Sequence, residues 1–275
     1  MVAITAKPKR GFSRLASIGV LTALLSAGMN NCYAEYAEGK GMLSIQFRKV
    51  IDLSQGINPS IPLWPGDPPV EFEDVANLET DGYFLRRFSM GEHSGTHMNA
   101  PNSFHAGGIG IDDYRPESLV RPASVIDVRG KTLRDPDYVI GIADIKAWEK
   151  RHGRLQRGSV VLFYTGWQAF WNDPERFFNA DAQGNLHFPG VGAETTAFLL
   201  EKRQIAGVGI DTHGADPGLD ENYATNTQVL AKNGIILENL TNLDRLPARG
   251  TTLVIGVLRL QGGSGSPVSV MAFAP

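Results

Sequence analysis

Three of the chain's six histidines lie in one short segment, EHSGTHMNAPNSFHAGG, at residues 92–108. His93 and His97 are four residues apart, Asn99 follows two residues later, and His105 ends the run. Neutral imidazole is the commonest protein ligand for zinc-class metals, and a catalytic site keeps about three protein ligands and an open position for water. The segment therefore favours a metal site over a loop with unrelated histidines.

Neither a regular helix nor a regular strand would bring the side chains of His93, His97 and Asn99 to one ion. In a helix residues 97 and 99 would point apart, and in a strand residues 93 and 97 would lie roughly 13 Å apart, at about 3.3 Å per residue. Gly95 allows a turn, and Pro101 disfavours a helix at the residue before it. We therefore expect a strand that leads into a loop, with a bend at Gly95 that lets the three side chains converge.

Other residue types point to substrate binding and proton transfer. The hydroxyl of Thr96 can donate to a group that supports a metal ligand or to a substrate oxygen. Trp64, Phe104 and Trp167 offer flat apolar surface for an aromatic substrate. For Trp167, packing in the core is an equal alternative. Glu238 ends the apolar run GIILE, where a buried strand would normally stay apolar, so it is a candidate catalytic residue.

Short β-branched or aromatic runs bounded by Gly, Pro or Asp predict nine strands. They cover residues 42–54, 70–75, 83–92, 123–128, 159–165, 205–211, 234–239, 251–260 and 267–274. Helical patterns cover residues 144–151, 167–172, 193–203 and 225–232. Many strands that alternate irregularly with few helices predict a single mixed-sheet α/β domain rather than a doubly wound parallel sheet. The Gly-rich stretch 260–270 lacks the Gly-Lys-Ser/Thr ending of a phosphate loop and predicts a hairpin turn.

The N-terminal residues 1–34 differ from the rest of the chain. Four basic residues and no acidic one precede an apolar run at residues 15–29 that is too short to span a membrane, and Ala34 stands before a polar stretch. This pattern predicts a secretory signal peptide over residues 1–34, a mature domain of residues 35–275, and a periplasmic or secreted protein.

Removal of that peptide would change the chemistry available to the chain. The sole cysteine, Cys32, would leave with it, so no thiol could act as nucleophile or metal ligand. The 26 Lys and Arg residues would fall to 22 against 29 Asp and Glu, a net charge of −7. A negative surface without a basic patch argues against nucleic acid or an anionic membrane as a partner.

The segment HSGTHMNAPNSF resembles the His-x-Gly-Thr-His-x-Asp-x-Pro signature of the cyclase-type metal-dependent hydrolases, which include bacterial kynurenine formamidase and isatin hydrolase. Residues 51–72, 161–167, 188–212 and 236–272 resemble further blocks of this family, so the resemblance covers nearly all of residues 45–273. It implies a fold of the swivelling β/β/α type with a few packed helices, and assembly as a homodimer or homotetramer.

The chain departs from the family pattern at several metal-ligand positions. Asn99 occupies the position of the signature's aspartate, which binds metal in the family. In family members with two metals, the second ion is held at the positions that are Ser103, Asn226 and Glu238 here, and only the glutamate matches. A carboxamide presents a neutral oxygen where two close dications would need a bridging charge. The resemblance therefore implies one divalent ion, zinc or manganese, in place of two.

The resemblance implies that His93, His97 and Asn99 bind this ion. His213, in the segment GIDTHGAD, is an extra imidazole that could serve as a further ligand or as a base. A metal-activated water would attack the carbonyl of a formamide or cyclic amide, such as N-formylkynurenine or isatin, and His105 or Glu238 would transfer the proton.

The sequence leaves two alternatives to a metal-dependent amidohydrolase. A serine hydrolase is disfavoured, because GGSGS lacks the strand-to-helix setting of a nucleophile elbow. A non-catalytic, ligand-binding family member that has lost its metal is favoured by Asn99, Ser103 and Asn226. The retained imidazoles and Glu238 favour the enzyme, so we expect an amidohydrolase.

Overall fold

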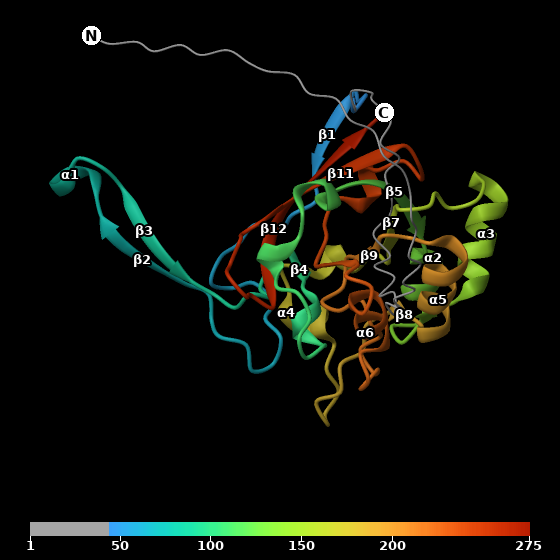
Figure 1. The fold of residues 1–275 in the computed structure, drawn as a ribbon. Helices are drawn as coiled ribbons and strands as arrows, with labels where there is room; N and C mark the ends of the chain where they lie inside the picture. Colours follow the sequence, from blue (N-terminus) through green and yellow to red (C-terminus); the bar gives the residue numbers. More distant parts are fainter. Residues whose placement is uncertain (1–43) are drawn as a thin grey trace, which may run out of the picture. The chain divides into compact units, whose positions relative to one another are not determined.

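Eight strands form a sheet that closes on itself in the computed structural model, which describes residues 44–275 (Figure 1). Along the sheet the strands are β1 (Lys49–Asp52), β12 (Gly265–Ala274), β11 (Thr251–Val257), β5 (Val120–Asp127), β7 (Val160–Tyr164), β9 (Gly207–Ile210), β10 (Ile235–Glu238) and β4 (His97–Asn99). The short strand β4 pairs with both β10 and β12, which closes a barrel-like ring and leaves β1 attached to β12. The signal peptide predicted for residues 1–34 lies outside the described residues.

The centre of the sheet is parallel and buried on both faces. Strands β5, β7, β9 and β10 run parallel, and the sequence of β7, VVLFY, is apolar throughout. Because alternate side chains point to opposite faces, Leu162 packs in one hydrophobic core and Phe163 in the other. The second core is completed by helices α3 (Ile142–His152), α5 (Ala193–Phe198), continued by a π-helical turn at Leu199–Arg203, and α6 (Ala224–Leu230).

The remaining elements are short. They are α2 (Arg129–Thr132), α4 (Pro174–Phe178), the parallel pair β6 (Val139–Ile140) and β8 (Gly190–Val191), and 3-10 turns at Pro101–Ser103, Ile111–Asp113, Pro116–Leu119, Trp167–Phe170 and Leu243–Arg245. Within residues 44–275 we find no helix with the length and apolar character needed to cross a membrane.

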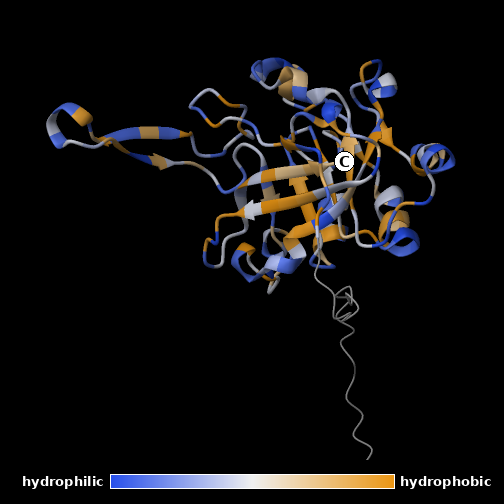
Figure 2. Cartoon of the chain, turned by 90° about the horizontal axis from the view of Figure 1, so that it is seen from above, coloured by the Kyte–Doolittle hydropathy of each residue, from blue (hydrophilic) through white to orange (hydrophobic). Residues whose placement is uncertain are grey.

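A separate two-stranded ribbon, which we call the arm, extends away from the barrel (Figure 1). It consists of β2 (Glu71–Ala76), β3 (Leu85–Ser89) and the one-turn helix α1 (Leu78–Asp81) between them. Figure 2 shows apolar and polar segments side by side on the arm, and its exposed apolar residues are Val75, Leu78, Tyr83, Phe84, Leu85 and Phe88. The arm ends at Ser89, four residues before the first histidine of the cluster.

The structure confirms a mixed α/β domain with few helices, but not the swivelling β/β/α type implied by the resemblance. Each predicted strand contains or overlaps an observed one, and the Gly-rich stretch 260–270 includes the turn of the β11–β12 hairpin. The helix predicted for residues 167–172 is a 3-10 turn at Trp167–Phe170. Strand β4 was not predicted, and its double pairing is what closes the sheet.

Candidate active site

The closing strand β4 places two polar side chains beside a carboxylate on β10. His97 lies directly opposite Glu238 in the β4–β10 ladder, and its Nε2 is 2.9 Å from Glu238 Oε2. Asn99 is two residues further along β4, so its side chain is on the same face, and its Nδ2 donates to the same oxygen at 3.2 Å. A three-residue strand thus presents an imidazole and a carboxamide to one buried carboxylate.

The loop before β4 brings His93 back to this pair. Gly95 has a φ of +66°, a conformation that side-chain-bearing residues rarely adopt, and it provides the bend expected from the sequence. His93 Nδ1 lies 2.8 Å from Asn99 Oδ1, and the rings of His93 and His97 are 5.3 Å apart. A Cβ at Gly265 of β12 would lie 2.6 Å from the His93 ring, so this close approach requires glycine there.

The tautomer of His93 is fixed from its outer side. The Ser264 hydroxyl donates to the Glu92 carboxylate at 2.6 Å, so its oxygen must accept from His93 Nε2–H at 3.0 Å. A neutral His93 therefore turns a bare Nδ1 toward Asn99 Oδ1. The Asn99 amide is fixed in this orientation, because its Nδ2 donates to Asn226 Oδ1 at 2.8 Å.

His97 repeats this arrangement. Its Nδ1 donates to the backbone carbonyl of Gly95 at 2.9 Å, which leaves Nε2 bare if the ring is neutral, facing the carboxylate of Glu238. When both rings are neutral, each imidazole holds its N–H outward and directs a lone pair at an oxygen acceptor. Facing lone pairs repel, so the centre of the cluster is built to receive positive charge.

Glu238 is a fixed negative charge in this centre. Its Oε1 accepts from the backbone N–H of Ala215 at 2.7 Å and from Asn226 Nδ2 at 3.1 Å. Burial raises the pKa of Glu238, but a cationic His97 and the hydrogen bonds from Asn226 and Ala215 outweigh burial and lower it to about 2. Donors that surround the carboxylate suit a charge-holding role, and the proton transfer expected of Glu238 stays a prediction.

Asp216 extends the cluster and was not singled out from the sequence. It accepts from the side-chain Nδ2 of Asn226 at 2.9 Å and from the backbone N–H groups of Asn226 and Thr225. Burial raises its pKa to about 6 against the effect of these hydrogen bonds. Asp216 could have been identified from its place in the loop after β9, because ligand sites in parallel sheets lie at the carboxyl ends of the strands.

His213 lies in the same loop, next to the cluster. Its ring is 6.1 Å from the His97 ring and 5.2 Å from the rings of both Trp64 and Phe178. Its Nε2 is buried without a hydrogen-bond partner among the described residues. Burial, with a smaller contribution from neighbouring His97, lowers the pKa of His213 to about 3, so the ring is neutral at neutral pH.

This depressed pKa predicts acid sensitivity. Below pH 6.5 the unfolded chain protonates residue 213 while the folded protein does not until about pH 3, so stability falls as pH falls through that window. Between pH 7 and pH 5 we expect the unfolding free energy of His213→Leu to rise relative to wild type by about 2 kcal/mol. Urea unfolding with chelator present measures this, with His152→Leu as control. A difference independent of pH would contradict it.

Two of the predicted substrate-binding residues lie near the cluster, in different roles. Trp64 packs over the ring of His213 and against Phe178. The Thr96 hydroxyl donates to the backbone carbonyl of Asn239 at 2.6 Å and accepts from the backbone N–H of Gln55 at 2.8 Å. The hydroxyl proton of Thr96 therefore holds the loop in place, in agreement with the alternative of a supporting role, and a contact with substrate stays a prediction.

Three predicted residues make their contacts elsewhere. His105 Nε2 contacts the backbone carbonyl of Thr227 at 2.8 Å, and the half-exposed ring of Phe104 lies 5.7 Å from that of Tyr223. Trp167 is buried in a third apolar cluster and donates its Nε1–H to the carbonyl of Phe177. For Trp167 the core-packing alternative is the one observed, and neither His105 nor Phe104 is positioned by contacts within the histidine cluster.

The cluster contains donor atoms of the types that metals bind. In the described part of the chain no three His, Cys, Asp or Glu side chains are grouped to hold a metal, and His93, His97 and Glu238 are among those searched. Two imidazole nitrogens and two oxygens nevertheless lie in contacting pairs, and such donor types suit zinc or manganese. These atoms are His93 Nδ1, His97 Nε2, Asn99 Oδ1 and Glu238 Oε2. Outward-anchored N–H groups are typical of metal-binding histidines. Asn226 turns an N–H, not its amide oxygen, toward Glu238 Oε1 at 3.1 Å.

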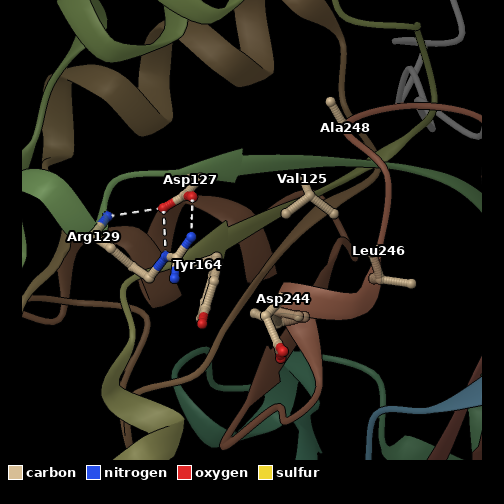
Figure 3. Close-up of a pocket in the computed structure, with 8 residues that line it drawn as sticks. Val125, Asp127, Arg129, Tyr164, Asp244, Leu246 and Ala248 are labelled. Carbon is tan, nitrogen blue, oxygen red and sulfur yellow. Dashed lines mark hydrogen bonds and ion pairs between the residues drawn. The ribbon is translucent and has the colours of Figure 1, made fainter.

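A cavity elsewhere on the barrel does not compete as the functional site. It has a volume of about 110 Å³ and lies at the ends of β5 and β7 (Figure 3). Arg129 in its wall is held by Asp127 at 2.8 and 3.0 Å and stacks 4.3 Å over Tyr164, so its guanidinium is already engaged. Typical ligand pockets occupy about 300–1,000 Å³.

Sequence comparisons agree with the resemblance noted above. The model of the Cyclase family matches residues 51–217. An isatin hydrolase of Roseibium aggregatum is 32% identical over 244 residues, covering 82% of this chain and 92% of that protein. A kynurenine formamidase of Bacillus cereus is 30% identical over 225 residues, covering 79% of this chain and 94% of its own length.

Solved structures show the same fold. Isatin hydrolase A from Ralstonia solanacearum superposes with a TM-score of 0.77 at 32% identity, covering 82% of this chain and 92% of its own. An isatin hydrolase bound to the product analogue thioisatinate also gives a TM-score of 0.77, at 31% identity and with the same coverage. A protein described as a predicted metal-dependent hydrolase from Bacillus stearothermophilus gives 0.64 at 25% identity, covering 82% and 98%.

Proposed function

Because the chain belongs to the Cyclase family, we propose that it is a metal-dependent amidohydrolase that cleaves an aromatic formamide or cyclic amide. The observation that carries this proposal is the pair of outward-anchored imidazoles, whose bare nitrogens face the oxygens of Asn99 and Glu238. Its relatives are named for isatin, a cyclic aryl amide, and for a formamide of kynurenine.

We propose that one divalent ion, zinc or manganese, is held by His93, His97 and Asn99, with Glu238 beside it. When bound, such an ion supplies Lewis-acid chemistry, lowering the pKa of a water molecule and polarising an amide carbonyl. The carboxylate of Glu238 offsets the positive charge and holds His97 and Asn99 in place.

The surrounding residues keep this arrangement rigid. The Glu92–Ser264 pair fixes the ring of His93, and the Gly95 carbonyl fixes that of His97, so neither imidazole needs to reorient during turnover. Trp64 packs against the ring of His213 and adds an apolar surface beside the cluster. Proton transfer by His105 stays a prediction from the sequence.

We also propose a cellular setting and an assembly. The signal-like N-terminus supports a periplasmic or secreted protein, and the resemblance supports a homodimer or homotetramer. A small aromatic amide would be its partner. The net negative charge expected for residues 35–275 argues against nucleic acid and anionic membranes as partners.

The test is hydrolysis of isatin and of N-formylkynurenine by the purified chain, followed by absorbance. We expect about one zinc or manganese ion per chain by elemental analysis, and a loss of activity of at least about 100-fold on chelation that either metal reverses. An acetate ester of a phenol serves as the control for unspecific hydrolysis. If the metal-loaded protein cleaves neither amide, the proposal is overturned in favour of a non-catalytic binding protein.

A further inference from the structure

The imidazole of His213 carries a buried ring nitrogen, Nε2, that forms no hydrogen bond with any described residue. The residue is only 5% exposed, and its Nε2 has no partner. Buried polar atoms nearly always have a partner, and those that lack one need an explanation, such as a ligand or an ordered water. This nitrogen is therefore a candidate contact for substrate.

Aromatic rings and the polar cluster enclose His213 from different sides. Trp64 and Phe178, each 5.2 Å away, are partly exposed, whereas Phe177 at 6.4 Å and His97 at 6.1 Å are buried. His213 thus lies between an aromatic layer that reaches the surface and the histidine cluster inside. A ligand that spans the two would pass this imidazole.

The backbone on both sides of His213 is tied to the candidate active site. The Ala215 N–H donates to Glu238 Oε1 at 2.7 Å, and the Thr212 carbonyl accepts from the N–H of Asn239 at 2.9 Å. The Thr212 hydroxyl donates to the Gly214 carbonyl at 2.8 Å. The position of the His213 ring relative to Glu238 is therefore set before any ligand binds.

We propose that the neutral His213 ring keeps its proton on Nδ1, accepts a hydrogen bond at Nε2 from the amide N–H of the substrate, and so selects secondary amides over tertiary, N-alkylated ones. This inference rests on the proposed amide hydrolysis. In both isatin and an aryl formamide the N–H lies between the aromatic ring and the carbonyl that is attacked. With the ring against Trp64 and Phe178 and the carbonyl at the histidine cluster, the N–H falls beside His213.

The experiment compares isatin with N-methylisatin, which lacks the N–H, in wild type and in variants. In wild type we expect methylation to lower kcat/KM by about 10- to 100-fold, mainly through KM, because the buried acceptor is left unpaired. In His213→Leu we expect kcat/KM for isatin to fall by a similar factor and the two substrates to differ by less than about threefold. His213→Gln keeps an acceptor and should keep part of the discrimination.

His152→Leu, at the exposed end of α3, is the matched control and should discriminate as wild type does. Thermal melts establish that each variant is folded. If His213→Leu does not fold, the ratio of kcat/KM for isatin to kcat/KM for N-methylisatin is compared between wild type and His213→Gln. The inference is overturned if His213→Leu keeps the wild-type ratio, or if wild type accepts both substrates equally. Failure of the proposed function looks different, since wild type would then cleave neither isatin nor N-formylkynurenine.

Discussion

Replacing His97 with alanine should lower kcat/KM on the order of 10³-fold or more and destabilise the protein by about 3–5 kcal/mol. The variant loses a proposed metal ligand and leaves Glu238 buried without the imidazole that lies 2.9 Å from its Oε2. A buried carboxylate stripped of its partner costs far more than the intact pair contributes. Steady-state kinetics and urea unfolding measure the two effects.

His152→Ala, outside the site, is the control and should change neither quantity appreciably. The double variant His97→Ala/Glu238→Gln removes the imidazole and the carboxylate charge together, so it should be less destabilised than the sum of its single variants, by about 1–3 kcal/mol. If His97→Ala loses less than about 1 kcal/mol, or the two substitutions prove additive, the buried pair is not the core of the site.

Replacing Asn99 with aspartate should act with opposite sign on the metal-free and metal-loaded proteins. Without metal, a second carboxylate would stand where Asn99 Nδ2 now donates to Glu238 at 3.2 Å, and we expect a loss of about 2–4 kcal/mol. With zinc or manganese present, the added charge should tighten metal binding by about 10- to 100-fold. Calorimetric melts with chelator or with metal, and competition against a chelating dye, measure these changes.

The matched control is Asn102→Asp, because Asn102 is on the same segment and donates to the backbone carbonyl of Gly262, away from the cluster. That variant should leave metal affinity unchanged. Equal destabilisation of the metal-free and metal-loaded Asn99→Asp proteins, with unchanged affinity, would show that Asn99 does not face the ion.

The sequence predicted the elements that show a local pattern, such as an apolar run or a glycine at a bend. The run VVLFY reads as a strand buried on both faces, and β7 is one. The expected bend at Gly95 is observed because only a residue without a Cβ takes its φ of +66° easily. Strand β4 escaped prediction because its three residues, HMN, have no periodicity of their own and pair with strands more than a hundred residues later. Because the sheet closes through β4, its closure was not predicted either.

The residues of the candidate site also differ in whether local sequence could identify them. His93, His97 and Asn99 were found as a short motif, and Glu238 as a charge in an apolar run. Asp216, Glu92 and Ser264 join the cluster only through contacts between distant segments, which no spacing in the sequence reveals. His105 follows the 3-10 turn at Pro101–Ser103 and contacts the carbonyl of Thr227 on α6, a contact that proximity in the sequence does not reveal.

The double pairing of β4 has a consequence for biogenesis. His97 lies opposite Glu238 on one side and opposite Pro267 on the other, and the ring of His93 is anchored by Ser264. Contacts between such remote segments form late, after the cost of closing long loops has been met. A ribosome-bound chain that has not yet released its final strand would have no assembled centre, so catalytic competence would mark the completion of folding.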